Sequence, residues 1–202
     1  MDEKRIYINP GGAPPNCFTI VYKDVFHLKS LYVVAREWLQ EQGWESCLGN
    51  WEYQKGSGNW EQLLYDNRSA GNKKIWIWWR LQKRTGNNYY RYYMNINFML
   101  LGWQDVEALH NGKKYKAQVG ELSIFIKPWI QYDFDDKWDN HPILKHIHPF
   151  FIQRIFKEDM LKREKLLLDE SYRLQGTIKK FLEGKHFGPD EAILYEPRHE
   201  FA

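Results

Sequence analysis

The sequence has few cysteines and no long apolar run. Its 202 residues include only two cysteines, Cys17 and Cys47, whereas a small chain held together by disulfides needs more of them. No apolar run approaches the ~20 residues that cross a bilayer. The first five residues, MDEKR, lack the apolar core of a secretion signal. We therefore expect free thiols, no membrane span and a cytoplasmic protein.

The short motifs of several enzyme classes are also missing. The sequence contains no G-x-x-x-x-G-K-[ST], G-x-G-x-x-G, G-x-S-x-G or H-E-x-x-H. This excludes the corresponding nucleotide-binding, dinucleotide-binding, hydrolase and zinc-protease interpretations. Cys47 can act as a nucleophile only if the fold brings a base such as His27 beside it. We therefore expect a non-enzymatic protein without a cofactor.

Histidines and carboxylates gather between residues 133 and 148, and these residue types bind zinc or iron. They are His141, His146, His148, Asp133, Asp135, Asp136 and Asp139. The histidines are spaced by five and two residues, so on a helix their rings point to different sides. Pro142 and Pro149 favour a helix start with capping or packing histidines. We therefore predict no metal site.

The composition is that of one folded domain with an uneven charge distribution. Hydrophobic residues make up 43% of the chain and aromatic residues 17%, including ten tryptophans. Residues 68–116 hold ten Lys or Arg against Asp105 and Glu107, whereas residues 186–202 carry a net charge of −3. An acidic tail and a basic sheet favour head-to-tail association of identical copies. The alternative is that both are ordinary solvated charges.

The N-terminal half alternates between loop and regular patterns. Residues 10–15 are PGGAPP, which sustain neither a helix nor a central strand, so we expect an extended arm over residues 1–17. Residues 18–22 are typical of a strand, and apolar residues then recur at helical spacing from Leu28 to Gly43. Loops with one short strand at residues 60–65 follow.

The strongest local pattern is a hairpin. Residues 74–84 and 89–100 flank the four-residue connection 85–88. If Arg84 pairs with Tyr89, then Ile77 pairs with Ile96, and the apolar side chains of both strands share one face. We predict this register, because a slip of one residue mixes the two faces.

One further strand pair, another strand and a long helix complete the pattern. Asn111-Gly112 predicts a tight turn between strands at residues 104–110 and 113–119, and another strand covers residues 121–132. Pro128 places that last strand at an edge or ends its pairing. Residues 142–183 have helical periodicity and would span ~60 Å, whereas strands of six to ten residues offer only ~20–33 Å of sheet. The helix must therefore overhang the sheet or break near residues 162–165.

These elements predict an α+β fold. We expect an antiparallel sheet of five to seven strands, packed by a short N-terminal helix and a long C-terminal helix, over residues 18–184. An acidic tail covers residues 185–202. The element order resembles that of START-like helix-grip domains, in which a curved sheet wraps around the last helix. The resemblance covers residues 18–184, implies a small-molecule or lipid binder, and assigns no ligand-binding residue.

Two sets of residues are candidate interfaces. Leu167, Leu174, Ile178 and Phe181 continue the apolar pattern of the long helix, and we expect them to contact a partner. The second set is an aromatic and basic sheet face with Trp76, Trp78, Arg80, Arg91, Tyr93, Phe125, Lys127 and Trp129. If the long helix covers the other face, this face is exposed and suits a protein or nucleic acid partner. If helices cover both faces, the tryptophans are ordinary core.

We therefore expect a self-assembling or scaffold protein that builds a larger complex, particle or filament, with itself or other protein subunits as partners. One alternative is a helix-grip binder of a small apolar ligand. The other is an RNA- or DNA-binding module that uses the basic residues 68–116.

Overall fold

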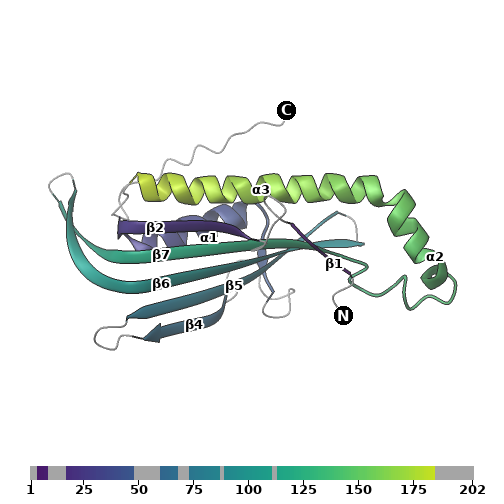
Figure 1. Ribbon diagram of the computed structural model, residues 1–202, viewed down its shortest axis with the longest axis horizontal. Coiled ribbons are helices and arrows are strands. Elements are labelled where there is room, and N and C mark those ends of the chain that lie inside the picture. Colours follow the sequence, from purple (N-terminus) through teal and green to yellow (C-terminus); the bar gives the residue numbers. More distant parts are fainter. Residues whose placement is uncertain are drawn as a thin grey trace.

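The protein is built on one antiparallel sheet with two helices packed on the same face (Figure 1). The computed structural model describes residues 4–8, 17–47, 60–67, 73–86, 89–110 and 113–184. The strands are β1 (Arg5–Tyr7), β2 (Phe18–Phe26), β3 (Glu45–Ser46), β4 (Glu61–Asn67), β5 (Lys74–Arg84), β6 (Tyr90–His110) and β7 (Lys113–Tyr132). The helical elements are α1 (Leu28–Glu41), α2 (Leu144–Phe150), the π-helix η1 (Phe151–Ile155) and α3 (Lys157–Glu183). The predicted α+β class is confirmed.

The sheet runs β1-β7-β6-β5-β3, with β2 also paired to β7 and β4 to β5, and every pair is antiparallel. The strand β1 lies inside the predicted N-terminal arm, so residues 4–8 belong to the sheet rather than to an extension. The other residues of that arm up to residue 16, and residues 185–202, lie outside the described part of the chain.

The two central strands are much longer than predicted. β6 has 21 residues and β7 has 20, because the four predicted strands join into two continuous ones. Gly102, at a φ of 59°, lies in the irregularity between Leu101 and Gln104. Opposite it, Gly120 lets the two backbones approach, since a Cβ there would lie 2.8 Å from the Cα of Trp103. At ~3.3 Å per residue each strand spans ~66 Å, which exceeds the ~40 Å of the 27-residue α3.

Pro128 lies in the middle of the sheet, not at its edge. β7 pairs with β6 on one side and with β2 and β1 on the other. The carbonyl of Pro128 accepts a hydrogen bond from the Ile8 amide, 3.1 Å away, just beyond the end of β1. A residue's nitrogen and carbonyl point to the same side of a strand, so the Pro128 nitrogen also faces Ile8, and the pairing of β7 with β6 loses no hydrogen bond. The predicted edge position is therefore wrong.

The C-terminal helical region does break, but earlier than predicted. Pro149 lies inside α2 and cannot donate a helical hydrogen bond. The helix then widens into η1, in which the Phe156 amide bonds to the Phe151 carbonyl at 2.8 Å, and α3 starts at Lys157. α3 follows the length of the sheet (Figure 1). None of the described helices is long and apolar enough to cross a membrane.

The hairpin register differs from the predicted one by two residues. Arg84 pairs with Arg91 and Ile77 with Phe98, while Ile96 lies opposite Trp79. Ile77 and Ile96 are both buried on the predicted face. The faces were correct and the register was wrong because side chains alternate with a period of two, so a shift of two residues keeps every side chain on its face.

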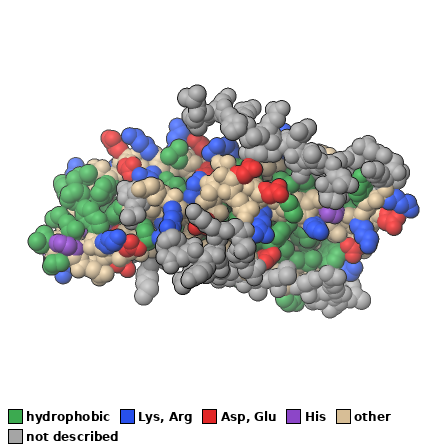
Figure 2. Space-filling model, turned by 180° about the vertical axis from the view of Figure 1, so that it is seen from behind, with side chains coloured by type: hydrophobic (Ala, Val, Ile, Leu, Met, Phe, Trp, Pro, Cys, Tyr) green, Lys and Arg blue, Asp and Glu red, His purple; other side chains and the backbone are tan. Residues whose placement is uncertain are grey.

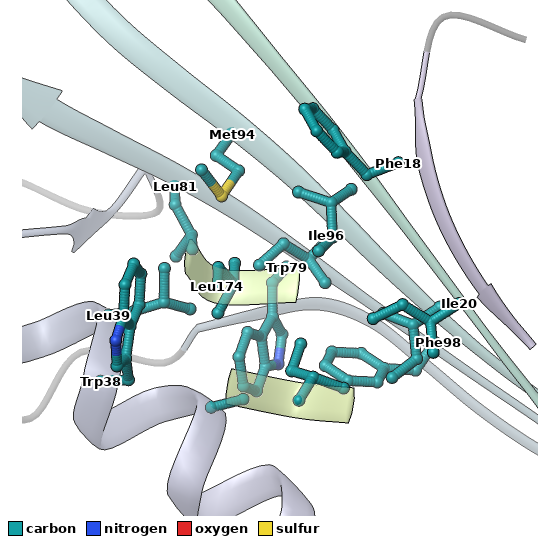
Figure 3. Close-up of a cluster of buried hydrophobic side chains, with 14 of the residues drawn as sticks. Phe18, Ile20, Trp38, Leu39, Trp79, Leu81, Met94, Ile96, Phe98 and Leu174 are labelled. Atoms are coloured by element: carbon teal, nitrogen blue, oxygen red, sulfur yellow. The ribbon is translucent and has the colours of Figure 1, made fainter. Parts of the chain in front are cut away.

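The core lies between this sheet face and the helices α1 and α3. Figure 3 shows Trp79, Ile96 and Phe98 projecting from the strands into this space, and all three are at most 1% exposed. A buried polar contact fixes α3 within it. The Glu170 carboxylate accepts hydrogen bonds of 2.8 Å from the indole of Trp44 and from the Lys83 ammonium.

Candidate interaction surfaces

The helix positions predicted to contact a partner lie inside the domain. Leu167, Leu174, Ile178 and Phe181 are at most 4% exposed and belong to the core. They pack on the sheet because the strands are long enough to accompany α3. These residues offer no surface to a second molecule, which corrects the prediction that placed an interface there.

The end of the molecule formed by α2 and η1 carries exposed apolar side chains that the sequence analysis did not single out. We call this set the apolar end. It consists of Ile143, Ile147, Phe150 and Ile155, which are between 38% and 68% exposed. Ile143, Ile147 and Phe150 recur at i, i+4 and i+7 and therefore form one stripe. Figure 2 shows apolar side chains gathered at this end of the molecule.

Aromatic rings on the inner side of α2 and η1 attach the apolar end to the sheet. We call them the ring cluster, and its members are Tyr89, Trp138, His148, Phe151 and Phe156. The ring centroids of Tyr89 and Phe156 are 5.1 Å apart, and those of Trp138 and Phe151 are 5.3 Å apart. His148 stacks on Trp138 at 5.2 Å. These contacts pack the inner side of α2 and η1 against the residues that precede β6 and follow β7, and leave the stripe on the outer side.

A polar network continues from the ring cluster to the N-terminal strand. The hydroxyl of Tyr89 lies 2.7 Å from Nε2 of His148, whose Nδ1 lies 2.8 Å from the Asp139 carboxylate. The Lys4 ammonium forms ion pairs with Asp133, Asp136 and Asp139 at 3.1, 2.6 and 2.5 Å. Burial lowers the pKa of Lys4, but hydrogen bonds to these aspartates outweigh it and hold that pKa above its ordinary value of 10.5. Lys4 therefore stays charged and joins β1 to the chain that enters α2.

The same network contains three of the residues that the sequence analysis considered as zinc or iron ligands. Ligand atoms of Asp133, Asp139 and His148 all lie within 4.8 Å of one another. The Lys4 ammonium contacts both aspartates, so a cation already balances this set. His141 instead caps the start of α2, where its Nδ1 accepts hydrogen bonds from the amides of residues 143 and 144. His146 is exposed.

The predicted aromatic and basic residues do share one sheet face, opposite the core. We call it the open face. By register it includes Arg5, Tyr7, Lys23, Glu45, Tyr65, Lys74, Trp76, Trp78, Arg80, Arg84, Arg91, Tyr93, Glu121, Phe125, Lys127 and Trp129. Trp76 is 39% exposed. None of the described helices lies on this side, so these tryptophans are not core residues.

Side chains of the open face stack on one another. The rings of Tyr93 and Trp129 lie parallel, with centroids 4.1 Å apart, and the Arg5 guanidinium lies 4.9 Å from the Trp129 ring. The Arg80 guanidinium lies 5.2 Å from the Trp78 ring.

Both cysteines are free, and Cys47 follows β3 with its amide bonded to the Arg80 carbonyl.

No family model, curated protein or solved structure matches this chain. The resemblance of the element order to helix-grip domains therefore stays a prediction.

Proposed function

We propose that the protein is a non-enzymatic assembly module in which the apolar end of one copy packs against the apolar end of another. The observation that carries this proposal is the joint exposure of Ile143, Ile147, Phe150 and Ile155 on a helical segment whose inner side packs on the ring cluster. Large apolar side chains that are exposed together mark interaction sites, because their removal from water is favourable.

A second copy of the chain is the partner that needs no further assumption. A twofold axis through the apolar end pairs the same stripe with itself, and this is the commonest symmetry of soluble oligomers. Exposed charges of both signs, Lys157 and Glu158, follow the stripe. A twofold arrangement that sets Lys157 of one copy opposite Glu158 of the other forms two ion pairs, which help to fix the orientation.

The packing of the core makes a helix-grip binder of a small apolar ligand a weaker candidate. Trp79, Phe98 and Leu174 lie between the sheet and α3 and are at most 1% exposed. They occupy the space in which a helix-grip domain would hold its ligand.

The proposal is tested with full-length variants. Ile143→Glu combined with Ile147→Glu places two charges at exposed positions of the stripe and leaves the ring cluster unchanged. Multi-angle light scattering should give a native mass near the 24.5 kDa of one chain for this variant and a multiple of it for the wild type. The matched control is Val33→Glu, at an exposed apolar position on α1, which should keep the wild-type mass. The proposal fails if the double variant, still folded by circular dichroism, keeps the wild-type mass.

A further inference from the structure

Positive charge dominates the open face. Among the described residues of this face, seven are basic, namely Arg5, Lys23, Lys74, Arg80, Arg84, Arg91 and Lys127. Two are acidic, Glu45 and Glu121, and Glu121 pairs with Lys23 at 3.0 Å. The face therefore attracts anions, and all seven cations lie on strands of the sheet.

Arg80 is held on this face without an acidic partner. Its Nη1 donates hydrogen bonds to the Asn97 side chain at 2.8 Å and to the Trp79 carbonyl at 2.9 Å. Within the described part of the chain, no carboxylate lies within 4.0 Å of the charged groups of Arg80, Arg91 or Lys127. Burial lowers the pKa of Arg80 and raises the pKa of the neighbouring Cys47 thiol to about 11. The thiol is therefore neutral at physiological pH and does not balance the arginine.

Three arginines also share one row across the sheet. Arg84 lies directly opposite Arg91, which lies opposite Gln131, which lies opposite Arg5. Adjacent strands are ~4.8 Å apart, so one bound phosphate can contact two neighbouring arginines of this row.

Exposed aromatic rings accompany these charges. Tyr65 and Trp76 lie directly opposite each other and are 49% and 39% exposed, and Tyr7 is 45% exposed beside the stacked Tyr93 and Trp129. Proteins that bind single strands combine basic grooves or faces with aromatic rings on which bases stack. A duplex hides its base faces and cannot use such rings.

We propose that the open face binds single-stranded nucleic acid, with phosphates paired to Arg80, Arg91 and their neighbours and bases stacked on Trp76 and Tyr65. This surface is separate from the apolar end, so its test does not depend on the proposed assembly. The competing occupant is the acidic segment 190–200 of the chain itself, which carries Asp190, Glu191, Glu196 and Glu200.

The test measures binding of a fluorescein-labelled 20-nucleotide oligo(dT) to the full-length protein by anisotropy, over a series of salt concentrations. Arg80→Ala/Arg91→Ala should weaken binding and lower the slope of log K against log [salt] by about 1–2. Trp76→Ala should weaken binding about fivefold or more with little change in slope. Lys165→Ala/Arg173→Ala, which removes two exposed charges from α3, is the control and should bind like the wild type.

Thermal melting checks that each variant is folded. If Arg80→Ala/Arg91→Ala does not fold, Lys127→Ala, at an exposed position, replaces it in the binding measurement. The proposal is overturned if the wild type does not bind oligo(dT) in low salt, or if the α3 control loses as much affinity as the open-face variants. It also fails if inorganic polyphosphate of equal charge competes as well as unlabelled oligo(dT), because stacking then contributes nothing.

The acidic segment is tested in the full chain by Asp190→Asn/Glu191→Gln/Glu196→Gln/Glu200→Gln. Our proposal expects this variant to bind oligo(dT) within about threefold of the wild type, since salt screens any charge that does not occupy the open face itself. A gain of tenfold or more would assign the open face to the acidic segment and overturn the proposal.

Discussion

Replacing Lys4 by methionine removes the cation of the polar network that joins β1 to the entrance of α2. Asp133 is 2% exposed and Lys4 is 22% exposed, so the variant leaves a buried carboxylate without its charged partner. Losing a hydrogen bond to a charged group costs ~1.5–3 kcal/mol. The pairs with Asp136 and Asp139, which are 60% and 43% exposed, add ~0–1 kcal/mol each. We expect a loss of about 2–4 kcal/mol in the free energy of unfolding.

For a chain of this size that loss lowers the melting temperature by about 4–16 °C, which differential scanning calorimetry at pH 7 resolves. The control is Lys137→Met, which removes an exposed lysine paired with Asp135 at 3.0 Å and should change the melting temperature by less than about 2 °C. Equal melting temperatures for Lys4→Met and the wild type would refute the reasoning, because they would show that β1 and its lysine add nothing to the fold.

Three further expectations concern acid stability, the core and the close approach of two strands. The hydrogen bond from Lys4 holds the pKa of Asp139 below its ordinary value of 3.8. The ionised Asp139 therefore stabilises the fold fully above about pH 4, and this contribution is lost as the pH falls through the lowered pKa. Lys4→Met should make the loss of stability with falling pH less steep in this range. Ile77→Asp buries an unpaired charge at a 5% exposed position and should leave no cooperative unfolding transition in urea at 25 °C. Gly120→Ala should lose ~1–3 kcal/mol, because its methyl group meets the backbone of Trp103, whereas Gly176→Ala in α3 has free space and should gain ~0.5–1 kcal/mol, both measured by urea denaturation.

The sheet faces were predictable because alternation is a local property. Each strand shows on its own which residues share a face, so Trp76, Trp78 and Arg80 were placed together correctly. The register was not predictable on this basis, since a shift of two residues leaves both faces unchanged. The lengths of β6 and β7 were not predicted, because Gly102 and Gly120 resemble strand ends. In the structure the two glycines lie opposite each other at one irregularity, and both strands continue beyond it.

The apolar end and its contacts with the rest of the domain could not be predicted from local sequence patterns. Pro149 was interpreted as part of a helix start and the break was predicted near residues 162–165, whereas Pro149 lies inside α2 and the helix widens into η1 directly after α2. The ion pair between Lys4 and Asp133 joins residues 129 positions apart, and no local signal relates them. The periodicity of α3 correctly predicted which residues form its apolar side. It did not show that this side packs on the sheet of the same chain, because that depends on the lengths of β6 and β7.

The claim that this protein assembles through its apolar end is tested most directly by sedimentation velocity of the wild type over a range of concentrations. The account predicts a species heavier than the 24.5 kDa chain whose fraction rises with concentration. A single species of one chain's mass at every concentration up to about 100 µM, where association worth more than ~5.5 kcal/mol would be visible, would contradict it.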